Sequence, residues 1–63
     1  MWTVVYIAQN KAEAEQLKMK LTTEGLLVKV KPLGGNKDAD ANSYEILVPA
    51  SEVDEAMEII NMF

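Results

Sequence analysis

The chain contains neither cysteine nor histidine, and this absence restricts how a sequence of 63 residues can be stabilised. A domain of this size buries only about 60% of the surface that its unfolded chain exposes, so many small domains depend on disulfides, a metal or a partner chain. Disulfides are impossible here, and a transition-metal site without imidazole or thiolate ligands is not expected. We therefore expect one domain, residues 1–63, stabilised by a well-packed core or by another chain.

The pattern of apolar and polar residues divides the chain into three strands and two helices. The predicted order is strand 2–8, helix 10–24, strand 26–31, loop 32–42, strand 43–48 and helix 51–62. Pro32 and Pro49 are expected to end the second and third strands. The core-facing residues of the helices are expected to be Ala14, Leu17 and Leu21 in the first, and Val53, Ala56, Met57 and Ile60 in the second.

Capping signals mark the ends of both predicted helices. Asn10 is a favourable N-cap, and Glu13 three residues later is the acid of a capping box that returns to the backbone of Asn10. Gly25 fits the left-handed position after the first helix, where Leu26 would add the accompanying hydrophobic contact. Ser51 is expected to cap the second helix.

The order β-α-β-β-α predicts an α+β fold of the ferredoxin-like type. In this arrangement the third strand lies between the other two, so the three-stranded sheet has the order 1-3-2 and both helices cover one face. The last strand of the complete ferredoxin-like pattern is not expected. The alternative is a parallel pairing of the first and second strands, with the third strand at an edge.

The uncovered face of this sheet is the candidate functional surface. Alternation in the second and third strands directs Lys29, Lys31 and Glu45 away from the helices. The first strand is apolar on both faces, and we assign its Val5 and Ile7 to the core. The predicted interaction surface consists of Trp2, Val4, Tyr6, Leu27, Lys29, Lys31 and Leu47.

The first strand is also expected to be an edge strand with little protection against pairing. Six of the seven residues in 2–8 are β-branched or aromatic, and none is charged or proline. Such an edge can pair with another chain. We therefore expect a homodimer, formed along this strand or between the open faces. In the competing arrangement the chain stays monomeric and residues 62–63 fold back over the edge.

No group of residues predicts catalysis, a cofactor or a metal site. The spacing of Asp38, Asp40 and Asn42 matches the first ligands of a calcium loop, but Ser43 and Pro49 stand where that loop needs its glycine and its bidentate acid. Gly34 and Gly35 precede no helix and are interpreted as a turn. Most acids of the second helix are expected to face solvent. The sequence therefore does not predict an enzyme.

The charge balance restricts the class of partner. Ten acidic residues against six lysines, with no arginine, give a formal net charge of −4. This balance disfavours nucleic acid or an anionic membrane as the main partner. Aromatic residues and lysines on a bare sheet are similar to an RNA-recognition platform, but the glycine-aromatic signature of that platform is missing. Without a targeting signal or a membrane-length apolar run, a cytoplasmic protein is expected.

Several stretches of the chain also match a known pattern. They are Val5-Tyr6-Ile7-Ala8, Ala12-Glu13-Ala14, Leu17, residues 24–28, residues 45–49 and Ala56. In these the chain resembles a small bacterial family of uncharacterised domains described as prokaryotic signal-transducing proteins. The resemblance implies a ferredoxin-like fold distantly similar to nitrogen-regulatory PII proteins. It implies no catalytic residue, and the nucleotide-binding loop and modifiable tyrosine of PII proteins have no counterpart here.

Two classes of function follow from the sequence. The first is a non-catalytic regulatory or protein-interaction module that acts through the open sheet face, with a second copy or another protein as its partner. The second is a small-ligand-sensing domain or small enzyme that uses the loop 33–42.

Overall fold

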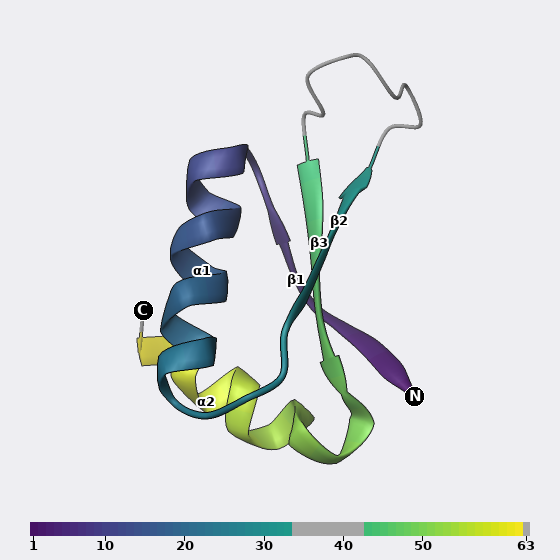
Figure 1. Ribbon diagram of the computed structural model, residues 1–63, viewed down its shortest axis with the longest axis vertical. Helices are drawn as coiled ribbons and strands as arrows, with labels where there is room; N and C mark the ends of the chain where they lie inside the picture. Colours follow the sequence, from purple (N-terminus) through teal and green to yellow (C-terminus); the bar gives the residue numbers. More distant parts are fainter. Residues whose placement is uncertain (34–42, 63) are drawn as a thin grey trace.

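The computed structural model describes residues 1–33 and 43–62, which form a three-stranded antiparallel sheet and two helices (Figure 1). The elements are β1 (Trp2–Ala8), α1 (Lys11–Thr23), β2 (Lys29–Leu33), β3 (Ser43–Pro49), the short 3₁₀ helix η1 (Ala50–Glu52) and α2 (Val53–Met62). The strand order is β1-β3-β2, and both outer strands are antiparallel to β3. The predicted α+β fold and strand order are confirmed, and the alternative with parallel pairing of the first two strands is wrong.

Strand β2 starts later and ends later than predicted. The N–H of Leu26 donates to the carbonyl of Leu21 at the end of α1, and the N–H of Leu27 donates to the Glu52 carboxylate (3.0 Å). These two donors are therefore used outside the sheet, and the ladder begins only at Lys29. Pro32 does not end the strand, because β2 is an outer strand and a residue there needs no N–H on its outward side.

The start of α1 has the predicted N-cap with one difference. Asn10 has an extended backbone, and its side-chain oxygen accepts a hydrogen bond from the N–H of Glu13 (2.8 Å). The reciprocal bond of the capping box goes one residue further back than expected. The Glu13 carboxylate accepts from the N–H of Gln9 (2.7 Å) and so ties the end of β1 to the first turn of the helix.

The end of α1 has the predicted glycine cap. Gly25 has φ +94° and donates its N–H to the carbonyl of Thr22 (2.9 Å), while Leu26 donates to the carbonyl of Leu21 (3.1 Å). These two bonds define a Schellman motif, in which the left-handed residue is favoured as glycine. Leu26 is buried with Leu21 in the core, so the cap also supplies the expected hydrophobic contact.

The start of α2 differs from the prediction. Ser51 lies within η1 and is not an N-cap, and no side chain caps η1, which follows Pro49. The α-helix proper begins at Val53. The Glu52 carboxylate accepts the N–H of Leu27 and joins this corner to the approach to β2. The prediction of a serine cap is therefore wrong.

The two cap sites provide a matched test. Asn10→Ala removes a side-chain acceptor that the structure shows in use, so we expect a loss of about 1 kcal/mol and a fall in melting temperature of roughly 4–8 °C. Ser51→Ala removes an exposed hydroxyl with no cap bond to η1, so its melting temperature should shift by at most about 2–4 °C. Thermal unfolding followed by circular dichroism measures both, and equal losses would contradict the placement of the caps.

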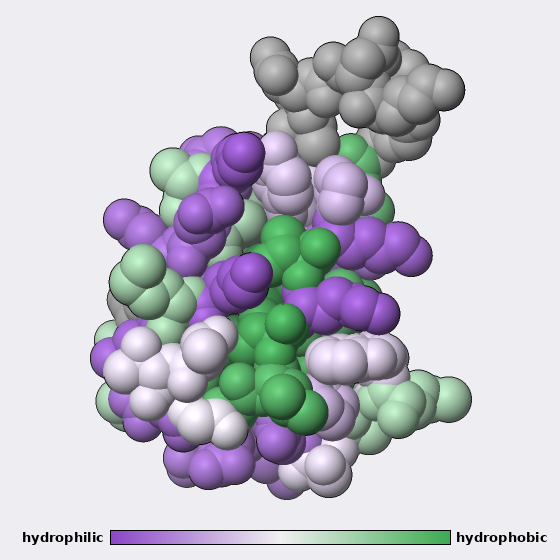
Figure 2. All heavy atoms as spheres, viewed as in Figure 1, coloured by the Kyte–Doolittle hydropathy of each residue, from purple (hydrophilic) through white to green (hydrophobic). Residues whose placement is uncertain are grey.

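The core lies between the sheet and the two helices, which cover the same face (Figure 1). Its buried members are Ala8, Ala14, Leu17, Leu21, Leu26, Ile46, Val48 and Ala56. The predicted core stripe of α1 is confirmed. In α2 only Ala56 is fully buried, whereas Met57, expected in the core, is exposed. An apolar strip is visible between α1 and the strands (Figure 2). Val28 and Val30 are half-buried and pack against the core.

Candidate functional site

A β-bulge in β1 determines which residues reach the uncovered face of the sheet. Val4 pairs with Leu47 and Tyr6 pairs with Ile46, so Val5 is an extra residue in the ladder. Val5 and Tyr6 both pack against the core, and the alternation of β1 is broken between them. The assignment of Tyr6 to the uncovered face is therefore wrong, and Ile7, assigned to the core, takes that place with 40% of its surface exposed.

The uncovered face carries an apolar column along β1. Trp2 and Val4 are 42% and 41% exposed, which is close to the value for Ile7. In the middle strand Leu47 and Glu45 stand opposite Val4 and Ile7. We use the term open face for Trp2, Val4, Ile7, Glu45, Leu47, Lys29 and Lys31. Among the described residues, no helix packs against this side of the sheet.

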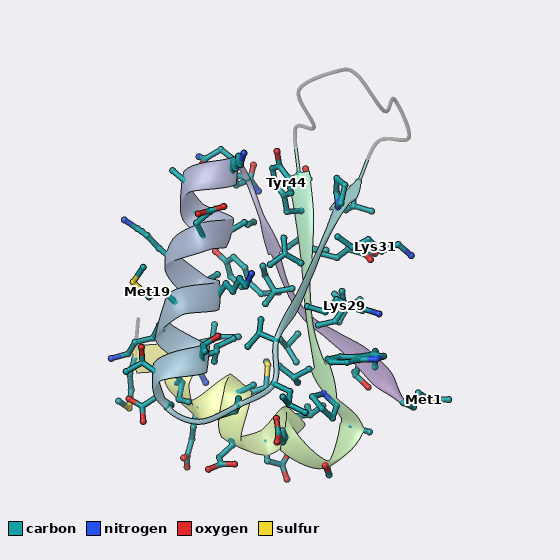
Figure 3. All side chains as sticks on the ribbon, viewed as in Figure 1. Met1, Met19, Lys29, Lys31 and Tyr44 are labelled. Atoms are coloured by element: carbon teal, nitrogen blue, oxygen red, sulfur yellow. The ribbon has the colours of Figure 1, made fainter. Side chains whose placement is uncertain are left out.

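The second column of the open face is cationic. Lys29 pairs with Leu47 and Lys31 pairs with Glu45, and Figure 3 shows both lysines directed away from α1. The open face therefore carries two positive charges and one negative charge, although the whole chain has a net charge of −4. The positive charges lie along β2, while the β1 column is neutral.

Lys29 and Trp2 connect the two outer strands across β3. The ammonium of Lys29 lies 4.9 Å from the centroid of the Trp2 ring. Trp2 belongs to β1 and Lys29 to β2, so the contact passes over the middle strand near Leu47. A cation–π contact at an exposed site contributes about 0.5–1 kcal/mol. The carbonyl of Met1 also accepts the N–H of Ala50 (2.8 Å), which holds the backbone next to Trp2.

Leu27 belongs only loosely to this face. It precedes β2 and is 63% exposed, and its N–H is held by Glu52. The structure thus brings together five of the seven residues predicted for the interaction surface, namely Trp2, Val4, Leu47, Lys29 and Lys31. The sequence missed Ile7, because a strand that is apolar on both faces contains no signal for a bulge.

Tyr6 forms a polar junction on the helix side instead. Its hydroxyl donates to the Glu13 carboxylate (3.1 Å), and the same carboxylate accepts the N–H of Gln9. The hydrogen bond to Glu13 and its negative charge raise the pKa of the Tyr6 phenol above its usual value. A phenol with a raised pKa is a weaker acid at neutral pH, so this junction fixes β1 against α1 and offers no activated group.

The junction predicts an alkaline titration that depends on Glu13. In a Tyr44→Phe background Tyr6 is the sole tyrosine, and we expect Glu13→Gln to lower its pKa towards about 10. Because folding raises this pKa, the stabilisation is complete below pH about 10 and is lost as the pH rises through the folded-state value. Absorbance at 295 nm against pH measures the titration. Superimposable titration curves for the Tyr44→Phe protein with and without Glu13→Gln would contradict the coupling.

Other surfaces of the described chain offer little chemistry. A groove of about 230 Å³ between the end of α1 and α2 is lined by Lys20, Glu24, Glu55, Glu58, Ile59 and Met62. Within residues 1–33 and 43–62, no three acidic residues are grouped to hold a metal ion, and every buried side-chain N or O atom has a hydrogen-bond partner. The helices of the described part are also too short and polar to cross a membrane.

Most of the alternative ligand site at 33–42 lies outside the described residues. This applies to Gly34, Gly35, Asp38, Asp40 and Asn42, so the interpretation of these residues stays a prediction. No protein-family model, curated protein or solved structure matches the chain. The resemblance to prokaryotic signal-transducing proteins therefore also stays a prediction.

Proposed function

We propose that the chain is a non-catalytic regulatory or protein-interaction module that acts through its open face, and that its partner is a second copy of itself. The observation that carries the proposal is the column of Trp2, Val4 and Ile7, each about two-fifths exposed on one face. Contiguous apolar side chains on a small domain favour a protein-interaction site. A regulatory role is what the family resemblance adds, and the cytoplasm is the compartment expected from the sequence.

The size of the chain also favours self-association. Among the described residues, the fully buried core contains eight residues, three of which are alanine. A core this small supplies only about 3–5 kcal/mol of net stability. Binding of a second folded copy stabilises the native state by mass action, so burial of the β1 column would add stability that the single chain does not have.

The polar groups of the described residues support a non-catalytic role. The raised pKa of Tyr6 favours the neutral phenol at physiological pH. A general acid or base instead needs a pKa near the working pH and a place in a cleft. The groove between α1 and α2 is lined by three acids and one lysine, without a nucleophile beside a base.

Light scattering across concentration tests the proposal. Between about 1 and 200 µM, a range typical of weak to moderate protein association, we expect the mass to rise from 7.0 kDa to twice that value. A mass of 7.0 kDa at every concentration would contradict the proposal. A nucleotide or metabolite that raises the melting temperature of this monomer would favour the ligand-sensing alternative.

A further inference from the structure

We propose that two copies pair antiparallel along β1, in the register that places Val4 of one copy opposite Ile7 of the other. This pairing would join the two sheets into one six-stranded sheet, in which the two open faces are continuous. The inference rests on the proposed function, because it states how the second copy binds. It uses the backbone edge of β1 together with the side chains of the open face.

The two outer strands differ in their suitability for pairing. Strand β2 carries Lys29, Lys31 and Pro32 within five residues, and lysine and proline are the usual means of blocking an edge. Strand β1 has seven residues with neither charge nor proline. Within the described part of the chain, β1 has a neighbouring strand on one side only. The edge that can accept another strand is therefore β1.

The bulge determines the register of this pairing. Residues that stand opposite each other in an antiparallel pair point to the same face. Val5 and Tyr6 are consecutive residues that both face the helices, so the alternation of β1 has one break. A partner strand keeps apolar groups on matching faces along its whole length only if its own break stands opposite this one. A second copy of β1 has the same break at the same residues, because its sequence is the same.

One register satisfies this condition. With the two-fold axis between Val5 and Tyr6, Val5 of one copy stands opposite Tyr6 of the other on the helix side. Val4 then stands opposite Ile7 on the open face, and Thr3 opposite Ala8 on the helix side. An axis at Val4 would instead place Trp2, which is on the open face, opposite Tyr6, which is not.

The charges of the open face favour this pairing over face-to-face packing. Across the joined sheet, the lysine columns of the two copies would be five strand spacings apart, about 24 Å, which is well beyond the screening length of about 8 Å at physiological salt. Packing of the open faces against each other would instead bury Lys29, Lys31 and Glu45. Edge pairing therefore brings the neutral columns together and leaves the lysines in water.

Disulfide cross-linking tests the register, since the chain has no cysteine of its own. We expect the Val4→Cys/Ile7→Cys double variant to form a covalent dimer under mild oxidation. The two positions within one strand are about 10 Å apart, which is too far for a disulfide inside one chain. Each single variant should stay largely uncross-linked. In this register, the cysteine of one copy is three residues along the strand from the same cysteine of the other copy. Met19→Cys, on the outer face of α1, measures random collision.

The possible outcomes separate the inference from the proposed function. Efficient cross-linking of the double variant, at least tenfold above the Met19→Cys background, supports the register. Equal cross-linking by Val4→Cys alone, or a double variant no better than background, overturns it. If light scattering still shows a dimer, only the inference fails, whereas a constant monomer rejects the proposed function as well. In the wild type, protection of β1 amides from hydrogen exchange should rise with concentration, and unchanged protection in a dimer would also overturn edge pairing.

Discussion

Replacing the apolar pair at the centre of β1 with two lysines should keep the chain monomeric at concentrations where we expect the wild type to dimerise. In the proposed register, Val4→Lys/Ile7→Lys places like charges directly opposite each other twice, once on each side of the two-fold axis. Like charges in opposed positions destabilise an antiparallel pair. Val4→Glu/Ile7→Lys loses the same apolar groups but places opposite charges in both pairs, and it keeps a lysine opposite Glu45 as the double-lysine variant does. It should therefore dimerise roughly tenfold more tightly than the double-lysine variant.

Light scattering or sedimentation at tens of micromolar measures this difference. Met19→Lys is the control for added charge, since Met19 is 70% exposed and lies on α1 away from the sheet. It should leave the dimer unchanged. Equal association of the two double variants would contradict the opposition of positions 4 and 7. A dimer that survives the double-lysine substitution unweakened would place the interface elsewhere.

The parts of the fold that the sequence predicted are those fixed by local signals. Asn10 and Gly25 mark the ends of α1 through bonds that reach only three to five residues. In β2 and β3 the charged residues Lys29, Lys31 and Glu45 alternate with apolar ones, so the sequence itself identifies the covered face. These signals, with the order of elements, were sufficient to predict the β1-β3-β2 sheet.

The missed features depend on contacts between distant segments. The late start of β2 follows from the bond between Leu27 and Glu52, which are 25 residues apart. The bulge at Val5 is a second missed feature. Residues 2–8 are apolar on both faces, so their sequence does not show which of them face the core. Tyr6 could have been placed through its partner, since Glu13 at the third position of α1 can reach back to the end of β1.

The same bulge changes the candidate site more than it changes the fold. Because of the bulge, Ile7 lies on the open face and the predicted Tyr6 does not, so the β1 column is more apolar at this end. It also creates the break in alternation on which the proposed self-pairing depends. A bulge is normally one of the features that protect an edge strand from unrelated strands. Here it would exclude regular strands and still admit a second copy, whose edge carries the same irregularity.

Ile46→Ala should destabilise the chain more than the corresponding change on the opposite face of the sheet. Ile46 is fully buried in β3, between Tyr6 of β1 and Val30 of β2, and it packs beneath the helices. Truncation of a buried isoleucine to alanine costs about 2–5 kcal/mol. Because a core of this size supplies only about 3–5 kcal/mol, the Ile46→Ala protein should be largely unfolded near room temperature.

Ile7→Ala is the matched control, because it removes the same atoms from a neighbouring strand on the open face. Ile7 is 40% exposed in the single chain, so its truncation should cost about 1 kcal/mol. Urea unfolding at low micromolar protein, where association is weak, compares the two variants without a contribution from the dimer. Equal losses would contradict the assignment of Ile46 to the core and Ile7 to the open face. A larger loss for Ile7→Ala that grows with protein concentration would instead locate its contribution in the interface between two copies.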